Sequence, residues 1–118
     1  MRGGNIILSK HLEMQKKLDN MVLKKKLLRG EIVDKKQILT STILALMVEV
    51  GEFSNENKCF KHWSVKLPAP EEEQLEEFID CYHFMLSIAN QMGWDANTLD
   101  IAYNKKYQKN IERQNTGY

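Results

Sequence analysis

The chain has 118 residues and a formal net charge of +1, with nearly equal numbers of basic and acidic side chains. This length fits one domain, 1–118, and the balanced charge argues against nucleic acid or an anionic membrane surface as a partner. No apolar run approaches the roughly 20 residues needed to span a bilayer, and the first ten residues, MRGGNIILSK, lack the apolar core of a signal peptide.

Residues that interrupt secondary structure are few along this chain. Both prolines fall in KLPAPEEE, and the six glycines lie mostly near segment ends. Four stretches remain that are long enough for helices, and none shows the alternation of a half-buried strand. The two cysteines, Cys59 and Cys81, are too few for a disulfide framework or a zinc cluster, so we expect packing residues in a reduced, cytoplasmic setting. The sequence predicts an all-α fold with a four-helix, bundle-like subunit.

The first predicted helix spans about 8–28 and places Leu12, Gln15, Leu18 and Val22 on an inward side. The loop RGEIVDKK follows and leads to a second helix over about 36–57. The segment KCFKHWSVKLPAP is then expected to be a connector, because its prolines stop helix formation.

The third and fourth predicted helices carry end signals. Three glutamates, Glu71 to Glu73, suit the positive first turn of a helix that runs to about Met92. Gly93 is a suitable C-cap, and Asp95 a suitable N-cap for a last helix that ends near Asn115.

Two acids of the second predicted helix lie among apolar neighbours. At about 100° per residue, Glu49 and Glu52 share one side of that helix. Glu49 is bracketed by Ala45 and Phe53, which are expected to be buried. An ionised carboxylate in such a place needs a proton, a cationic partner or a metal.

The third predicted helix repeats this pattern. Glu77 has Cys81, Phe84 and Ile88 on its side of the helix, and Asp80 lies one turn further on. The spacings E-x-x-E and E-x-x-D would allow the two pairs to meet across adjacent helices. Several oxygen ligands of this kind suit Mg²⁺ or Mn²⁺. Exposed surface acids or members of structural salt bridges are the alternative interpretation.

The last predicted helix carries polar groups on a side that geometry turns inward. Leu99 and Tyr103 begin an inward stripe, which continues as Lys106, Asn110 and Arg113. Such a row is suited to phosphate oxygens. A solvated, frayed C-terminal helix remains the alternative. Acids that hold a metal, together with a row that holds phosphate, suggest a nucleotide.

Four segments, in order and with compatible spacing, resemble the dimeric all-α dUTPases, which belong to the all-α nucleoside triphosphate pyrophosphatases that include MazG-type enzymes. The segments are EVGEFSNE, FKHWS, EEFIDCYHFMLSIA and AYNKKYQKNIERQNTGY. The resemblance extends from about Leu12 to Tyr118. It implies hydrolysis of dUTP to dUMP and pyrophosphate, with Mg²⁺ as cofactor and attack of an activated water on the α-phosphorus.

The same resemblance implies residue roles. The metal-binding role falls to four acids: Glu49, Glu52, Glu77 and Asp80. Glu49 or Glu52 would also orient or deprotonate the attacking water. The phosphate-binding role falls to three residues of the last helix: Lys106, Asn110 and Arg113. The base- and sugar-binding roles fall to four residues: Trp63, Lys61, His83 and Gln15. Asp19 stands where some relatives have Asn, and Glu56 is expected to pair with a cation of the phosphate-binding row.

Structural interpretations remain open for several of these residues. Trp63 would then fill a hydrophobic gap in the connector, His83 would be a surface or capping residue, and Gln15 would make structural hydrogen bonds only. The methionines at 14, 47 and 85 are expected to be core filler.

The chain departs from the dimeric dUTPase pattern in one place. Only NQMGWDANTLDI separates the third and last predicted helices, where many dimeric dUTPases carry an extra helical segment. The compact MazG-type enzymes are similar in this respect, so a broader dNTP pyrophosphatase that acts on dCTP or modified nucleotides is an alternative. A non-catalytic helical interaction module is a further alternative. Helices that are apolar on more than one side also predict a homo-oligomer, by default a dimer.

Overall fold

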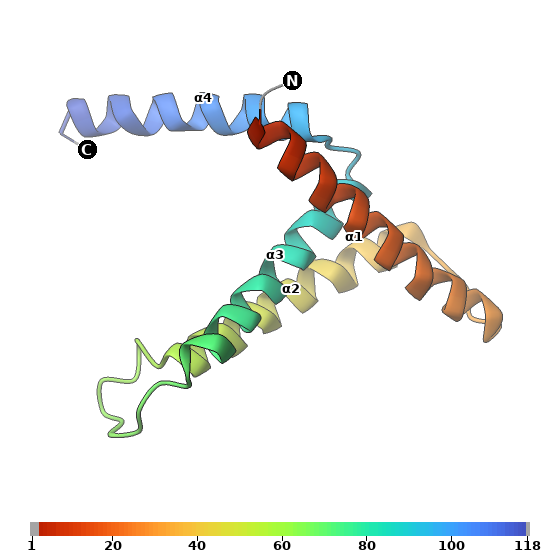
Figure 1. Cartoon of the computed structure of the whole chain (residues 1–118), viewed down its shortest axis with the longest axis horizontal. Coiled ribbons are helices and arrows are strands. Elements are labelled where there is room, and N and C mark those ends of the chain that lie inside the picture. Colours follow the sequence, from red (N-terminus) through yellow and green to blue (C-terminus); the bar gives the residue numbers. More distant parts are fainter. Residues whose placement is uncertain (1–2, 118) are drawn as a thin grey trace.

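The computed structural model describes residues 3–117, apart from the side chains of residues 3–5, and these residues form four helices with no strand. The helices are α1 (Gly3–Leu28), α2 (Lys35–Asn57), α3 (Glu71–Gln91) and α4 (Ala96–Asn115) (Figure 1). The all-α prediction is confirmed, and α1 begins five residues earlier than expected. Met1, Arg2 and Tyr118, which belong to the predicted domain and the C-terminal motif, lie outside the described residues. No described helix is long and apolar enough to cross a lipid bilayer.

Side-chain caps and a glycine set the helix limits. The carboxylate of Asp34 accepts a hydrogen bond from the backbone N–H of Lys36 at 2.9 Å and so caps α2. Asp95 accepts one from the N–H of Thr98 at 2.8 Å, and this bond is the largest cause that lowers the pKa of Asp95. Gly93, with φ of 77°, takes the left-handed conformation that ends the preceding helix.

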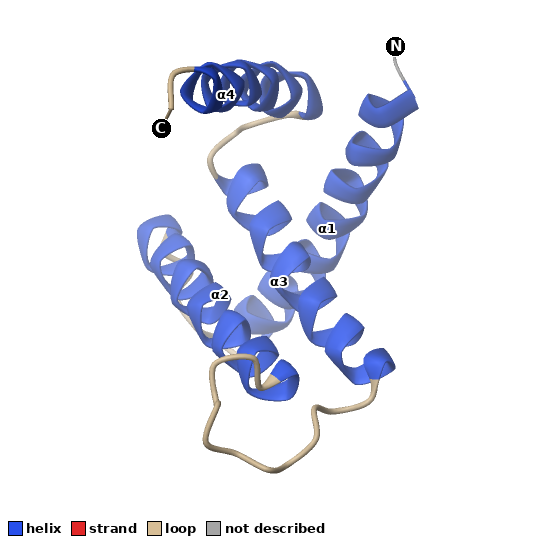
Figure 2. Cartoon of the chain, turned by 90° about the vertical axis from the view of Figure 1, so that its left-hand side faces the viewer, coloured by secondary structure: helices blue, strands red, loops and turns tan. Residues whose placement is uncertain are grey.

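The helix α3 is the centre of the arrangement. It runs antiparallel to α2, and α1 crosses it, whereas α4 approaches α1 alone (Figures 1 and 2). Hydrogen bonds tie both ends of the α2–α3 pair: Asn57 to Gln74 at 2.8 Å, and Gln91 to Thr42 at 2.9 Å. A small core lies where α1, α3 and the first turn of α4 meet. Its buried apolar residues are Leu12, Leu86, Ala89 and Ala96, with Leu8, Tyr82 and Leu99 packed against them.

Beyond its first turn, α4 extends past α1 without covering another helix (Figure 1). Leu99 is half-buried, but Tyr103 is 71% exposed, and every described residue from Ile101 onward is exposed. The prediction of an inward-facing stripe is therefore wrong for this part of α4 within one subunit. The physical reason is that only the first part of α4 lies against the N-terminal part of α1, and no described element of the same chain lies beneath the rest (Figure 1).

The subunit is open for its size. It exposes 9637 Å², whereas a compact monomer of 13.8 kDa exposes about 6,600 Å². Its radius of gyration is 17.8 Å, against about 13.5 Å for a compact domain of 118 residues. Much of the apolar surface of the helices thus lacks a covering element in the same chain.

Candidate active site

The antiparallel pairing of α2 and α3 brings three carboxylates together. Glu49 from α2 meets Glu77 and Asp80 from α3, and one oxygen from each lies within 4.8 Å of the others. All three residues are half-buried. One turn from Glu49, the rings of Phe53 and Phe78 pack edge to face at 5.8 Å and hold the two helices together.

The crowding of these acids raises the pKa of Glu77. A hydrogen bond with Glu49 is the largest cause that raises the pKa of Glu77 from 4.5 to about 6, and burial and the charges of Glu49, Asp80 and Glu52 add to it. Burial, followed by the same negative charges, also raises the pKa of the Cys81 thiol. The Oε2 atom of Glu77 is buried without a hydrogen-bond partner among the described residues. The cluster therefore needs protons or a cation.

The donor set fits a hard divalent cation. Carboxylate oxygens are the ligands that Mg²⁺ and Mn²⁺ prefer, and the unpaired Oε2 of Glu77 offers an additional acceptor. Glu52 is exposed and lies outside the group of three, although its charge acts on Glu77. The structure thus assembles three of the four predicted metal ligands and leaves the fourth at the edge.

A polar network lies beside the acids, where α1 crosses α3. Gln15, only 5% exposed, donates from Nε2 to Asp19 Oδ1 at 2.8 Å, and its Oε1 accepts a hydrogen bond from His83. Ser87, 4% exposed, donates to the other oxygen of Asp19 at 2.7 Å. The predicted residues Gln15 and His83 therefore do lie together, with Asp19 and Ser87 as their neighbours. We call these four residues the polar network.

Two further residues connect this network to α2. Gln91 donates from Nε2 to Ser87 Oγ at 3.1 Å and to Thr42 Oγ1 at 2.9 Å. The sequence motifs do not mark Ser87, Gln91 or Thr42 as site residues. The available signal was their spacing, because polar residues one turn apart on two crossing helices can form a continuous chain of hydrogen bonds.

Replacement of Ser87 by Ala is expected to lower the free energy of unfolding by about 1–3 kcal/mol, because a half-buried carboxylate, Asp19, loses a donor. Urea denaturation followed by circular dichroism measures the change. Ser41→Ala, at an exposed position of α2, is the matched control and should stay within about 0.5 kcal/mol of the unmodified chain. Equal stability of the two variants would mean that the network does not stabilise the α1–α3 crossing.

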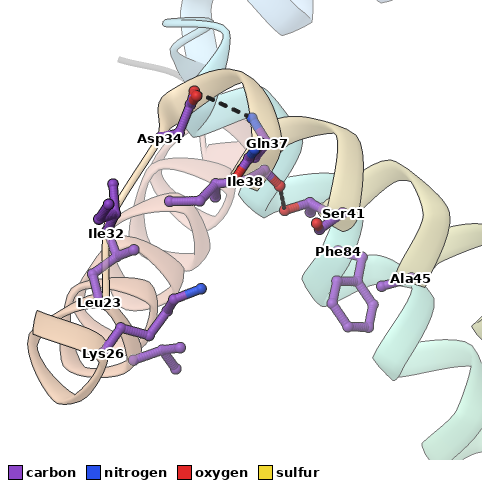
Figure 3. A pocket seen from close by; sticks show the side chains of 11 residues that line it. Leu23, Lys26, Ile32, Asp34, Gln37, Ile38, Ser41, Ala45 and Phe84 are labelled. Atoms are coloured by element: carbon purple, nitrogen blue, oxygen red, sulfur yellow. Dashed lines mark hydrogen bonds between the residues drawn. The ribbon is translucent and has the colours of Figure 1, made fainter. Parts of the chain in front are cut away.

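A groove with a volume of about 340 Å³ opens between α1 and α2 above α3 (Figure 3). Its walls come from three helices and the α1–α2 loop: Val22, Leu23, Lys26, Ile32, Asp34, Gln37, Ile38, Ser41, Thr42, Ala45 and Phe84. Ala45 lies one turn before Glu49, and Phe84 one turn after Asp80. The groove is therefore next to the acids and has the size of a small-molecule site.

The connector between α2 and α3 carries Trp63 and Lys61. Trp63 is 67% exposed and packs edge to face against His62 at 5.0 Å and against Phe60 at 6.4 Å. Lys61 donates from Nζ to Asn55 Oδ1 at 2.8 Å. The indole thus does not fill a hydrophobic gap.

Three groups of predicted site residues lie apart within one chain: those of the connector, of the polar network and of α4. Along α3 the connector lies on one side of the acids and the polar network on the other. The α4 residues Lys106, Asn110 and Arg113 are exposed and lie far from the acids, because α4 approaches only α1 (Figure 2). For the same reason, Glu56 of α2 does not lie beside the α4 cations of its own subunit.

The fold and the acid cluster define an all-α protein with a carboxylate site between two antiparallel helices. A family model described as dUTPase matches residues 7–102, so the chain belongs to this all-α dUTPase family, and the resemblance seen in its motifs is confirmed. Comparisons with curated proteins and with solved structures give no match. The family indicates a diphosphatase-type hydrolase that acts on a nucleotide. The matched residues include the acids, the connector and the polar network but end before Lys106.

Proposed function

We propose that this protein is a Mg²⁺-dependent dUTP diphosphatase, a single domain that converts dUTP and water into dUMP and pyrophosphate. The observation that supports the proposal is the convergence of Glu49, Glu77 and Asp80 beside a groove, in a chain of the dUTPase family.

The proposed reaction is a displacement at the α-phosphorus. The water oxygen forms a bond to that phosphorus, the bond to the α–β bridging oxygen breaks, and pyrophosphate leaves. Glu49 or Glu52 orients the water and accepts its proton. Four acids would hold Mg²⁺: Glu49, Glu52, Glu77 and Asp80. When bound there, the ion supplies charge neutralisation for the phosphate oxygens and acidifies the attacking water.

The nucleoside is proposed to lie along the groove, since the groove and the polar network both begin within one turn of the acids. Gln15 and His83 then border the base or the sugar. Trp63 and Lys61 remain candidates on the other flank of the acids, where the exposed indole is available to stack on a base.

Asp19 supports a second candidate, a broader dNTP pyrophosphatase with dCTP among its substrates. A carboxylate presents only acceptors when ionised, and both Asp19 oxygens already accept hydrogen bonds from Gln15 and Ser87. Near a base edge, such a group favours the amino group of cytosine over the O4 carbonyl of uracil.

The test is pyrophosphate release from dUTP, dCTP, dTTP, dATP, dGTP and UTP, each with Mg²⁺ and with EDTA. We expect Mg²⁺-dependent release with dUTP as the best substrate. A preference for dCTP would support the second candidate instead. Release from none of the six would contradict both and favour a non-catalytic interaction module.

We also propose that the subunit works as a homodimer in the reducing cytoplasm, where its thiols stay free. The outer side of α2 is uncovered and apolar. Its exposed residues are Ile43, Leu44, Met47, Val48 and Val50. A second copy that packs there would bury this surface, as closed two-fold dimers commonly do.

A further inference from the structure

We infer that α4 completes the site of a second copy, so that Lys106, Asn110 and Arg113 bind phosphate in trans. The inference rests on the proposed function and adds which subunit supplies the phosphate-binding groups. Each site would then consist of the acids of one subunit and the α4 strip, Lys106, Asn110 and Arg113, of its partner.

One face of α4 continues from the part that packs on α1 into the part that is exposed. At about 100° per residue, Ala96, Leu99, Tyr103 and Asn110 point to the same side of the helix. Ala96 is buried against α1 and Leu99 is half-buried, whereas Tyr103 and Asn110 are exposed on the extension of that face. A face that is covered at one end and bare over the rest is suited to contact with another chain.

The acids of a subunit lie too far from the cations of its own α4 to be contacted by them. Asp80 lies about 16 Å along α3 from Gln91, and Lys106 lies about 15 Å along α4 from Ala96. The two helices diverge after the short turn between them (Figures 1 and 2). Beyond its first turn, α4 does not approach α2 or α3. A lysine side chain therefore cannot span the distance to the acids of its own subunit.

The exposed side chains of α4 are complementary to the surface around the acid cluster. The exposed side chains of α4 include four cations: Lys105, Lys106, Lys109 and Arg113. Beside them lie exposed apolar groups: Tyr103, Tyr107 and Ile111. The acid cluster brings oxygens of Glu49, Glu77 and Asp80 within 4.8 Å of one another, so it attracts cationic side chains as well as a metal ion. The apolar groups of α4, which have cations beside them, would therefore pack well on an apolar surface that has acids beside it.

The exposed surface area of the subunit is large enough for an interface with a second copy. The subunit exposes 9637 Å², about 3,000 Å² more than a compact monomer of this mass. This excess exceeds the roughly 800 Å² that each partner contributes to a standard interface. The uncovered α2 face contains Val48, which lies one turn from the exposed Glu52, so a copy seated on that face reaches the edge of the acid cluster.

The test is complementation between two inactive subunits. Glu49→Gln and Lys106→Ala chains with different affinity tags are co-expressed, and the mixed dimer is purified through both tags. In trans, one of its two sites combines the intact acids of the Lys106→Ala chain with the intact α4 strip of the Glu49→Gln chain. We expect about half of the wild-type turnover per dimer, because the two sites of a two-fold dimer are equivalent.

If each site were formed within a single subunit, the mixed dimer would recover no turnover. An inactive mixed dimer, with active wild-type protein and two inactive parents, would overturn the inference and leave the proposed function intact. Gln108→Ala is the matched control, because Gln108 is exposed and lies on the opposite side of α4 from the strip. It should retain wild-type activity.

A second measurement does not depend on catalysis and so separates failure of the inference from failure of the proposed function. The photoreactive residue p-benzoylphenylalanine is placed at Tyr107, an exposed aromatic position. The inference predicts a covalent dimer in which Tyr107 is joined to α2 or α3 of the second chain. Absence of a covalent dimer, or crosslinks to other surfaces alone, would overturn it.

Discussion

Glu49→Gln is expected to lower kcat for dUTP hydrolysis by about a hundred- to ten-thousand-fold, because it removes both a ligand charge and the proposed proton acceptor. The side chain keeps its shape, and the helix content should stay unchanged. Steady-state pyrophosphate release and far-ultraviolet circular dichroism measure the two properties.

Glu72→Gln provides the comparison for this variant. Glu72 is an exposed glutamate in the first turn of α3, away from the cluster, and its loss should leave kcat within about twofold. Full activity of Glu49→Gln would contradict the role of Glu49. Equal losses in the two variants would indicate a general effect of charge.

The second large effect concerns pH and metal binding at Glu77. The folded-state pKa of Glu77 is raised to about 6, above its ordinary 4.5, so the folded chain retains a proton that the unfolded chain has lost between these values. Without metal, the contribution of Glu77 to stability is therefore complete below about pH 4.5, decreases as pH rises, and is lost above about pH 6. Mg²⁺ should restore stability above pH 6, since it binds the ionised cluster of the folded state.

Thermal unfolding between pH 4.5 and 7.5, with EDTA or Mg²⁺, tests this expectation. Glu77→Gln should have a higher Tm than the wild type in EDTA at pH 7.5 and should lose most of the Mg²⁺-dependent increase. Glu76→Gln changes the adjacent exposed glutamate and should behave as the wild type does in both respects. A Glu77→Gln chain with the wild-type pH dependence and the wild-type response to Mg²⁺ would contradict the metal assignment.

Local signals were sufficient to predict the helices and much of the acid cluster. Asp34 and Asp95 are side-chain caps that satisfy backbone N–H groups, so the starts of α2 and α4 follow from the sequence. The spacing of Glu77 and Asp80 puts both on one side of α3. Their meeting with Glu49 then requires only that α2 and α3 pack antiparallel.

The position of α4 could not be predicted in the same way. An amphipathic pattern predicts that a face is covered but does not specify which element covers it, so the inward side predicted for Tyr103 and Lys106 has no covering element within the subunit. The polar network was only partly predicted, because residues such as Ser87 and Gln91 are equally common on solvated faces. Their hydrogen bonds depend on the angle at which α1 crosses α3, which no local pattern specifies.

The small core at the α1–α3 crossing has a consequence for biogenesis. Four buried apolar residues, two of them alanines, provide little hydrophobic free energy to offset the conformational entropy of a chain this long. In the proposed homodimer, folding and pairing of chains would then be a single thermodynamic event, as in obligate dimers whose melting temperature rises with protein concentration. Newly made chains would remain sensitive to proteolysis until they meet a second copy.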